Sequence, residues 1–389
     1  MGKSENKFQF RQIVIISGGH FCHDIFGSFL AVCLPLLISK FSLTMALAGL
    51  FTVFFRAPSL LNPVLGLLSD RINLFRLAIW APAATAAAMG LLGVAPSYGV
   101  VCILLFFAGI SSAIFHVAGP VMIAKVAGEH QGRAMSFWMT GGEIARTLGP
   151  ILGVWMISQW GFENTYPMVG VGLMASLFLY FQLKETQVVP VDNGTQSSFL
   201  EVLTRMRQVL LPLVGIMTAC SFMMSTLMAF LPTFMVQSGK SLWLGGAALA
   251  VLEAFGTMGT FFGGTLSDRM GRRRLLLCIL PLSAVVMAAF VYAPDWLAVP
   301  LLALLGATLF ASAPIELAIV QDHSAAHRGT ANGVFMGVSF MLMAGVTFLV
   351  GWLSDHIGMD RAFLISSFIG LLGTPFVFFL PRRDRDVKS

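Results

Sequence analysis

Charged residues are scarce in this sequence. They make up 11% of its 389 residues, whereas hydrophobic residues make up 57%. Soluble domains carry roughly 25% charged residues, so this chain cannot cover a surface that faces water on all sides. Its apolar runs are continuous rather than alternating, which argues against a transmembrane β-barrel. The composition therefore predicts an all-α integral membrane protein.

Motifs of catalysis are also missing. No nucleophile with a neighbouring base and no glycine-rich phosphate loop appears in the chain. The cysteines lie inside apolar runs without the spacing of a disulfide framework or a metal site; they are Cys22, Cys33, Cys102, Cys220 and Cys278. We therefore expect a protein that is not an enzyme and that holds no cofactor or metal.

A hydrocarbon core of about 30 Å needs about 20 helical residues. By this measure the sequence contains twelve apolar stretches long enough to cross a bilayer. The predicted spans are 12–38, 46–68, 77–94, 100–124, 134–157, 166–183, 210–236, 243–266, 275–292, 296–320, 330–353 and 362–380. A polar segment separates the first six from the last six. The predicted organisation is an N-terminal six-helix half (1–183), a cytoplasmic linker (184–209) and a C-terminal six-helix half (210–389).

The basic residues indicate the orientation of the chain. Of the 24 lysines and arginines, only Lys40, Lys240 and Arg361 fall on one side, Arg56 and Arg146 lie within spans, and the rest fall on the side of both termini. Cytoplasmic loops carry the excess of positive charge, so both termini and the linker are predicted to be cytoplasmic. This distribution also explains the net charge of +6 without a nucleic-acid partner.

The two halves repeat each other. The segment GLLSDRINLFRL (66–77) recurs as GTLSDRMGRRRL (264–275), and CLPLLI (33–38) is answered by FLPTFM (230–235). QGRA (131–134) and RGTA (328–331) match at the same offset of about 197 residues. Matches at one offset predict two six-helix halves in parallel, related by a pseudo-two-fold axis along the membrane normal.

The repeated GxLSDRxGRRR segment resembles the signature loop of the major facilitator superfamily. The resemblance covers the whole chain and implies a twelve-helix transporter that works by alternating access around a central site. It also implies that loop residues latch helices together on the cytoplasmic side in the outward-open state; here these are Asp70, Arg71, Asp268 and Arg269. Asn73 departs from the signature, which has glycine at that place.

Within the superfamily, GHFCHDIFGSFLAVCLPLL (19–37) and Phe115-His116 resemble the fosmidomycin-resistance type of efflux protein. GGEIARTLGPILG (141–153) partly resembles the glycine-proline motif of the fifth helix in drug/proton antiporters. The fourth-helix arginine of that antiporter class is missing, because ILLFFAGISSAIFH (103–116) has no basic residue before His116.

Ionisable residues at membrane depth are costly, so each one is a functional candidate. We expect Arg56, Arg146, Glu253 and His116 to bind substrate, and Asp24, His20 and Glu143 to carry protons. His20 and Asp24 share a helix face at i, i+4, whereas His23 is expected to face elsewhere. Arg56 and Glu253 occupy equivalent positions in the two halves, and Glu316 is interpreted as a gate or a helix-packing residue.

Glu143 and Arg146 are three residues apart and so share a helix face. One interpretation is an intrahelical ion pair that makes both charges tolerable in the bilayer. The other is that Arg146 holds an anionic group of the substrate through its planar guanidinium while Glu143 carries or gates a proton. The sequence leaves both open.

Three functions are compatible with these features. The first is proton-coupled efflux of a small amphipathic or anionic organic molecule, and the second is a proton symporter or facilitator that imports an organic anion. The third is a membrane sensor that does not transport, for which the chain offers no large extra domain. We expect a monomeric multi-pass protein of the bacterial inner membrane, with a small-molecule substrate, protons and lipid as its partners.

Overall fold

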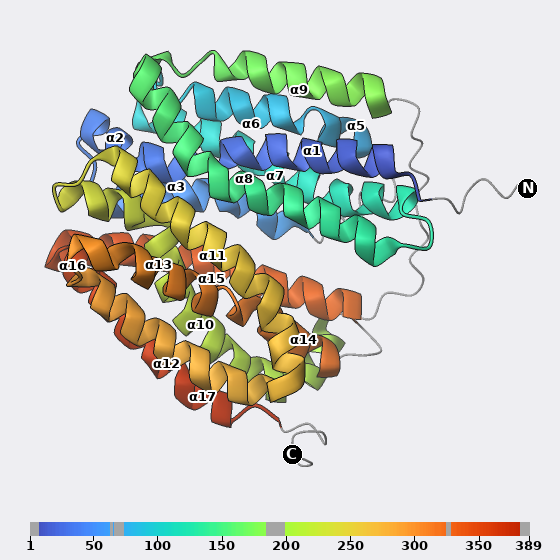
Figure 1. Cartoon of the computed structure of the whole chain (residues 1–389), viewed down its shortest axis with the longest axis vertical. Coiled ribbons are helices and arrows are strands. Elements are labelled where there is room, and N and C mark those ends of the chain that lie inside the picture. The colour runs from blue at the N-terminus through green and yellow to red at the C-terminus, as the bar shows by residue number, and fades with distance from the viewer. Residues whose placement is uncertain (1–7, 63–64, 66–73, 184–198, 324–327, 382–389) are drawn as a thin grey trace, which may run out of the picture. The chain divides into compact units, whose positions relative to one another are not determined.

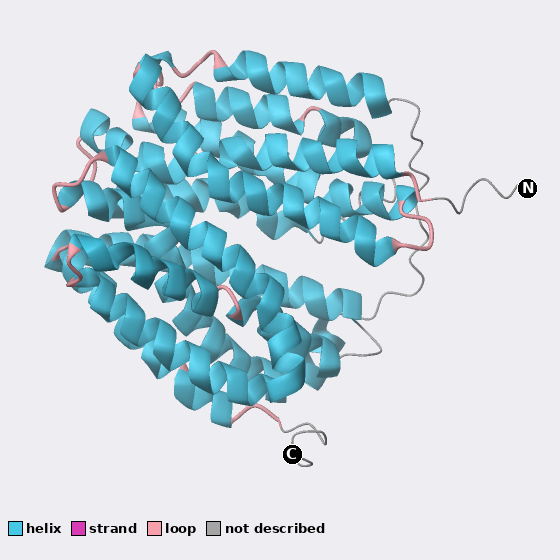
Figure 2. Ribbon diagram, in the orientation of Figure 1, coloured by secondary structure: helices cyan, strands magenta, loops and turns pink. Residues whose placement is uncertain are grey.

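The computed structural model describes residues 8–62, 65, 74–183, 199–323 and 328–381. These residues form helices joined by short loops, and they contain no β-strand (Figure 2). Nine helical segments in this part of the chain are long and apolar enough to cross a membrane. The all-α membrane fold predicted from the sequence is therefore confirmed.

The chain folds into two compact units. Among the described residues, unit 1 takes those of 1–43, 51–192 and 239–250, and unit 2 takes those of 44–50, 193–238 and 251–389. Helices α3 (Met45–Arg56) and α11 (Leu242–Met270) each contribute to both units. The predicted boundaries at 183/184 and 209/210 border or lie near residues outside the described part, and they stay predictions.

Unit 1 is built around α1 (Phe10–Gly27), which packs against α6, α7, α8 and α9 (Figure 1). Its other elements are α2 (Leu30–Phe41), η1 (Ala57–Leu61), α5 (Leu74–Ile79), α6 (Ala81–Gly90), α7 (Tyr98–Val126), α8 (Gln131–Trp160), η2 (Phe162–Asn164) and α9 (Met168–Leu183). Buried side chains of α1, α7 and α8 around Ile13, Ile123 and Trp138 form its apolar core.

Unit 2 is built in the same way around α10 (Phe199–Gln237), which packs against α12, α14, α15 and α16. Its other elements are α12 (Arg272–Val291), α13 (Asp295–Leu309), α14 (Ser312–His323), α15 (Arg328–Ile357), α16 (Met359–Leu372) and α17 (Thr374–Phe378). Its core includes Ile216, Leu276 and Ile315, which are fully buried.

The internal repeat predicted from the sequence extends to helix boundaries. The stretch from the start of α13 to the end of α14, Asp295 to His323, is α7 shifted by 197 residues, and α15 is α8 shifted by the same number. Gly161 and Gly358, which end α8 and α15, share a backbone conformation at φ 79° and 86° that glycine adopts without steric cost. The same local chemistry therefore ends both helices.

Proline explains two departures from the predicted spans. The predicted span 77–94 is divided into α5 and α6 at Trp80, and Pro82 occupies the first turn of α6. Likewise α3 ends at Arg56 and the chain continues as the 3₁₀ helix η1, which contains Pro58. Proline has no backbone N–H to continue a helix behind it but is tolerated in a first turn. Residues 63–64 and 66–68 of the predicted span 46–68 lie outside the described residues.

Close helix contacts in unit 1 depend on glycine, as expected for helices that pack without a hydrophobic driving force. A Cβ atom at Gly172 of α9 would lie 2.2 Å from the Cβ of Ala86 and 2.8 Å from the carbonyl oxygen of Pro82. Two residues earlier on the same helix, a Cβ at Gly170 would meet nothing within 4 Å. Gly172 therefore lies in the contact between α9 and α6, and Gly170 serves as a control position outside it.

We expect Gly172→Ala to destabilise the purified protein by about 1–3 kcal/mol, because α9 cannot approach α6 without a clash. Gly170→Ala should leave stability unchanged or raise it slightly, since alanine favours helix over glycine by up to about 1 kcal/mol. The measurement is the thermal midpoint of aggregation of the detergent-solubilised variants. Equal midpoints for the two variants would contradict the contact between α6 and α9.

Candidate functional site

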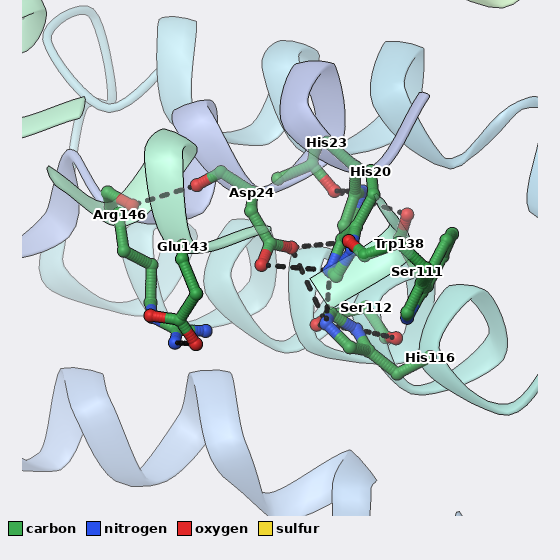
Figure 3. Close-up of polar contacts among 11 residues, drawn as sticks. His20, His23, Asp24, Ser111, Ser112, His116, Trp138, Glu143 and Arg146 are labelled. Atoms are coloured by element: carbon green, nitrogen blue, oxygen red, sulfur yellow. Dashed lines mark hydrogen bonds and ion pairs between the residues drawn. The ribbon is translucent and has the colours of Figure 1, made fainter. Parts of the chain in front are cut away.

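Four titratable side chains meet inside unit 1, where α1, α7 and α8 pack together (Figure 3). His20, His23 and Asp24 come from α1, and His116 comes from α7. We call these four residues the Asp24 cluster. The sequence placed His20 and Asp24 on one face, and the structure adds His116 from a helix about 90 positions further along the chain.

The three histidines direct the same ring atom at one carboxylate. The Nε2 atom of His20 lies 3.2 Å from Oδ2 of Asp24, and Nε2 of His116 lies 3.5 Å from Oδ1. The Nε2 atoms of His20 and His116 are themselves 3.4 Å apart. Asp24 therefore faces two imidazoles from two different helices at hydrogen-bonding distance (Figure 3).

The opposite ring atoms fix how these histidines are protonated. Nδ1 of His20 lies 2.8 Å from the carbonyl oxygen of Trp138, and Nδ1 of His116 lies 2.9 Å from that of Ser112. A carbonyl oxygen only accepts hydrogen bonds, so each Nδ1 carries a hydrogen and donates it. In a neutral ring the Nε2 atom then presents a lone pair.

Two lone pairs and a carboxylate converge in this arrangement, and they repel one another unless a proton lies among them. A proton on either Nε2 atom turns the contact with Asp24 into a charge-assisted hydrogen bond, which is among the stronger kinds. The geometry of the Asp24 cluster is thus that of a group holding at least one extra proton.

His23 also belongs to this cluster, contrary to the expectation that it faces elsewhere. Its Nε2 atom lies 4.0 Å from Oδ1 of Asp24, and its Nδ1 atom lies 3.2 Å from the hydroxyl of Thr85. Thr85 donates to Ser111, and Ser111 donates to the carbonyl of Ala81. Because the Thr85 hydrogen is already used, Nδ1 of His23 donates to Thr85 and its Nε2 turns towards Asp24.

Aromatic rings enclose the cluster on one side and leave it open at one residue. His20 stacks on Trp138 with ring centroids 3.9 Å apart, and His23 stacks on Phe115 at 4.4 Å. The Asp24 side chain is 10% exposed, whereas that of His116 is 39% exposed. His116 is therefore the point of access to an otherwise buried set of proton-binding atoms.

The glycine pair of α8 brings that helix onto the cluster. A Cβ atom at Gly141 would lie 2.4 Å from the carbonyl oxygen of Ser17, and one at Gly142 would lie 2.6 Å from Cε1 of His20 and 3.2 Å from Oδ2 of Asp24. Only glycine fits at both positions. The backbone of α8 thus forms one wall of the Asp24 cluster.

The next residues of α8 carry the predicted ion pair. Oε1 of Glu143 contacts Nη2 of Arg146 within one helical turn, as their spacing predicted. The Arg146 side chain is 38% exposed and that of Glu143 is 14% exposed. In the view of Figure 3 the pair lies on the other side of Asp24 from the histidines. The arginine is thus both neutralised by Glu143 and accessible.

Other predicted residues lie apart from the cluster. Arg56 ends α3 in unit 1, whereas Glu253 is buried on α11 in unit 2, so a shared role for the two stays a prediction. Asp268 and Arg269 lie at the end of α11, where Asp268 and Asp322 both contact Arg272, at 3.5 and 2.7 Å. Asp70 and Arg71 lie outside the described residues, and the latch stays a prediction.

The cluster also has the elements of a metal site. Ligand atoms of His20, Asp24 and His116 all lie within 4.8 Å of one another, and two imidazoles with a carboxylate suit several transition metals. A proton shared by the Nε2 atoms and the Asp24 carboxylate, as described above, would use these same ligand atoms. The sequence-based expectation of no metal or cofactor stays a prediction.

Comparison with known proteins agrees with the fold and with the resemblance seen in the sequence. The family model of the Major Facilitator Superfamily matches residues 16–347. The chain is 26% identical to the fosmidomycin resistance protein of Escherichia coli K12 over 381 residues, covering 95% of this chain and 93% of the relative. It is 27% identical to the riboflavin transporter RfnT of Brucella anthropi, covering 94% and 90%.

A solved structure of a bacterial homologue of the human lysosomal transporter Spinster, in an inward-facing and occupied conformation, has a TM-score of 0.81 to this chain. The two share 14% sequence identity, and the match covers 95% of this chain and 96% of that one. The chain therefore belongs to the Major Facilitator Superfamily of membrane transporters, whose fold has twelve helices in two pseudo-symmetric halves.

Proposed function

We propose that this protein is a proton-coupled secondary transporter that exports a small amphipathic or anionic organic molecule across the bacterial inner membrane. The observation that carries the proposal is the Asp24 cluster. Three imidazole Nε2 atoms surround one buried carboxylate, and their outer Nδ1 atoms donate to fixed acceptors. Such a group binds and releases protons without changing its hydrogen-bonded frame.

The position of the cluster suits a coupling site. Ionisable residues inside a membrane mark proton and substrate pathways, and histidine changes charge near physiological pH. His116 is the exposed member, so protons enter and leave the cluster through it. A proton lost from Nε2 leaves lone pairs facing Asp24, and relief of that repulsion favours movement of α7 or α8 relative to α1.

Arg146 supplies a site for the negative group of a substrate. Its guanidinium is accessible and contacts Glu143, and a guanidinium matches carboxylate, phosphate and phosphonate in a bidentate manner. An anion that binds Arg146 competes with Glu143, which becomes easier to protonate when it loses its cationic partner. Substrate and proton thus act on the same pair of residues.

Efflux is favoured because the chain is similar over nearly its whole length to a protein named for resistance to fosmidomycin. The alternative is import of an organic anion by symport or facilitated diffusion, with the same residues. It is supported by the similarity to a riboflavin transporter and by the missing basic residue in the fourth helix before His116. Efflux and import differ in the side of the membrane from which the protein binds its substrate and its protons.

To test the proposal, the full chain is reconstituted in liposomes with a trapped pH dye, and fosmidomycin and riboflavin are added one at a time. We expect one of these probes to move protons through the wild-type protein. Asp24→Asn should reduce that proton movement to the level of protein-free vesicles, because the carboxylate that balances the imidazolium charge is gone. The matched control is Asp360→Asn, which removes an exposed carboxylate at the start of α16.

Substrate flux without proton movement in the wild-type protein would rule out proton coupling and favour a facilitator or another ion. Proton movement that survives in Asp24→Asn would remove the cluster from the coupling pathway. The direction follows from the same vesicles under an imposed pH gradient. Probe and protons that move in opposite directions indicate an antiporter, and movement in the same direction indicates a symporter.

A second prediction separates the two interpretations of Glu143 and Arg146. Arg146→Gln removes one charge of the pair and leaves a carboxylate in the span, at a cost of up to about 2.5–3.5 kcal/mol on insertion scales. We expect less of this variant in the membrane fraction, measured by quantitative immunoblotting. The double variant Glu143→Gln/Arg146→Gln should return the amount to that of the wild type, because no charge remains.

Transport by the double variant then decides between the interpretations. If the pair serves only to neutralise itself, the double variant transports the probe as the wild type does. If Arg146 binds the anionic group, the double variant is present at wild-type levels but transports an anionic probe much more slowly. A double-mutant cycle that measures no interaction energy between Glu143 and Arg146 would contradict the ion pair itself.

A further inference from the structure

A second buried carboxyl lies in unit 2, and the coupling site proposed above does not use it. Glu316 of α14 is 5% exposed, and the same helix carries Ile315 and Ile319 of the apolar core of unit 2. The thiol of Cys220 on α10 and the hydroxyl of Ser312 one turn earlier lie within hydrogen-bonding reach of its carboxyl group. Its Oε1 atom has no hydrogen-bond partner among the described residues.

The predicted spans of the C-terminal half offer no basic side chain to balance a charge on Glu316. The six predicted spans from 210 to 380 contain no lysine, arginine or histidine, and their only acidic residues are Glu253 and Glu316. Helices α10, α12 and α15 pack against α14, and α11 approaches its start, since a Cβ atom at Gly263 would lie 2.8 Å from the Cβ of Ala311. Within these spans α10 and α12 contribute only the thiols of Cys220 and Cys278, and α15 contributes no titratable group.

Two basic residues near the ends of these helices already have partners. On α14 itself, Nδ1 of His323 lies 2.9 Å from the carbonyl oxygen of Ile319. Arg272, at the start of α12, contacts Asp322 at 2.7 Å and Asp268 at 3.5 Å. Asp322 lies six residues beyond Glu316 on α14, about 9 Å along a helix that rises 1.5 Å per residue. An unpaired carboxylate in a buried site costs several kcal/mol, so the neutral acid is the form that this environment accepts.

The internal repeat gives this group a counterpart in unit 1. At the offset of 197 residues, Cys220 is equivalent to His23, and Ala313, one turn before Glu316, is equivalent to His116. The contact between α10 and α14 is therefore the repeat of the contact between α1 and α7 that builds the Asp24 cluster. Both units carry a proton-binding group at the same helix crossing, one with histidine partners and one with a thiol and a hydroxyl.

We propose that Glu316, together with Cys220 and Ser312, is a second proton-binding site of this protein, the counterpart in unit 2 of the Asp24 cluster. The proposal rests on the proposed function, since a second proton has a use only in a proton-coupled transporter. A proton is the ligand that fits. The group is buried, and one carboxyl with one hydroxyl cannot provide the several oxygen atoms that Ca²⁺ or Mg²⁺ requires.

The two sites differ in how they tolerate the loss of a proton. The Asp24 cluster contains its own bases, so a proton can move among its members while charge stays balanced. Glu316 has no such partner, so its proton leaves only when water or a cation reaches the carboxylate. Proton release from Glu316 is therefore tied to opening of the contact between α10 and α14.

The first test needs no substrate. Infrared spectra of the detergent-solubilised full chain at neutral pH should contain the C=O stretch of a protonated carboxylic acid, and the wild-type minus Glu316→Gln difference should isolate it. Asp24→Asn should leave this band in place, because Asp24 faces histidines and is ionised. Ser312→Ala should shift its frequency, because a hydrogen bond to the carboxyl is lost while the charge of the protein is unchanged.

An absent band in the Glu316→Gln difference spectrum would overturn the proposal. If that variant does not fold, Ser312→Ala and Cys220→Ser decide the question, because both keep the carboxyl. A carboxylic-acid band that neither of them shifts would place the protonated group elsewhere, such as at Glu253. These outcomes do not depend on transport, so they are independent of the liposome experiment on Asp24.

The second test uses whichever of fosmidomycin or riboflavin moves protons in the liposome assay. Glu316→Gln should lower the number of protons moved per probe molecule by about one while transport continues, as expected when one of two proton sites is made permanently neutral. An unchanged ratio would show that Glu316 is a packing residue. Failure of Asp24→Asn to affect coupling would instead count against the first site and leave the infrared result standing.

Discussion

The cost of a charge in hydrocarbon is the constraint on which the rest of this structure depends. With 11% charged residues, the chain places very few of them in its spans, and three cases show different ways of compensating the charge. Glu143 contacts Arg146 on the same helix, whereas Asp24 faces histidines of two helices. Glu316 has only a thiol and a hydroxyl. Glu143 is thus compensated by an ion pair. In our proposals Asp24 shares a proton with histidines, and Glu316 keeps a proton of its own.

Glycine contributes to the second of these three cases. Helix α8 can approach α1 beside Asp24 because Gly141 and Gly142 lack side chains, which would overlap Ser17, His20 or Asp24. The carbonyl of Trp138, which fixes the protonation of His20, belongs to the same helix. One stretch of sequence, TGGEIARTLGP with the residues just before it, thus provides both the close contact of α8 with α1 and the orientation of the His20 imidazole.

Much of the fold could be predicted from the sequence, because the properties that determine it are local. Apolar length predicts the helices, and matches at one offset predict a repeat that the structure carries to the ends of α7 and α8. The break between α5 and α6 was missed, although Pro82 was its signal. The i, i+3 spacing of Glu143 and Arg146 predicted their contact correctly.

The site was predicted only in part, because its geometry depends on contacts between distant segments. From the spacing along α1 we correctly predicted that His20 and Asp24 lie together, but wrongly predicted that His23 faces elsewhere. The orientation of His23 is set by Thr85 and Ser111 on two other helices, and no pattern within α1 encodes them. Likewise, the outer partner of His116 is a carbonyl of its own helix, which only the backbone coordinates reveal. A polar Thr85 within an alanine-rich span was the one available signal.

The contact at Gly142 has a mechanical consequence. Because the backbone of α8 borders His20 and Asp24 directly, no side chain lies between them to absorb a small displacement. Glu143 follows Gly142 in the chain, and Arg146 lies one turn later. In the proposed transport cycle, a displacement of Arg146 by a bound anion is therefore transmitted through the backbone of α8 to the wall of the Asp24 cluster.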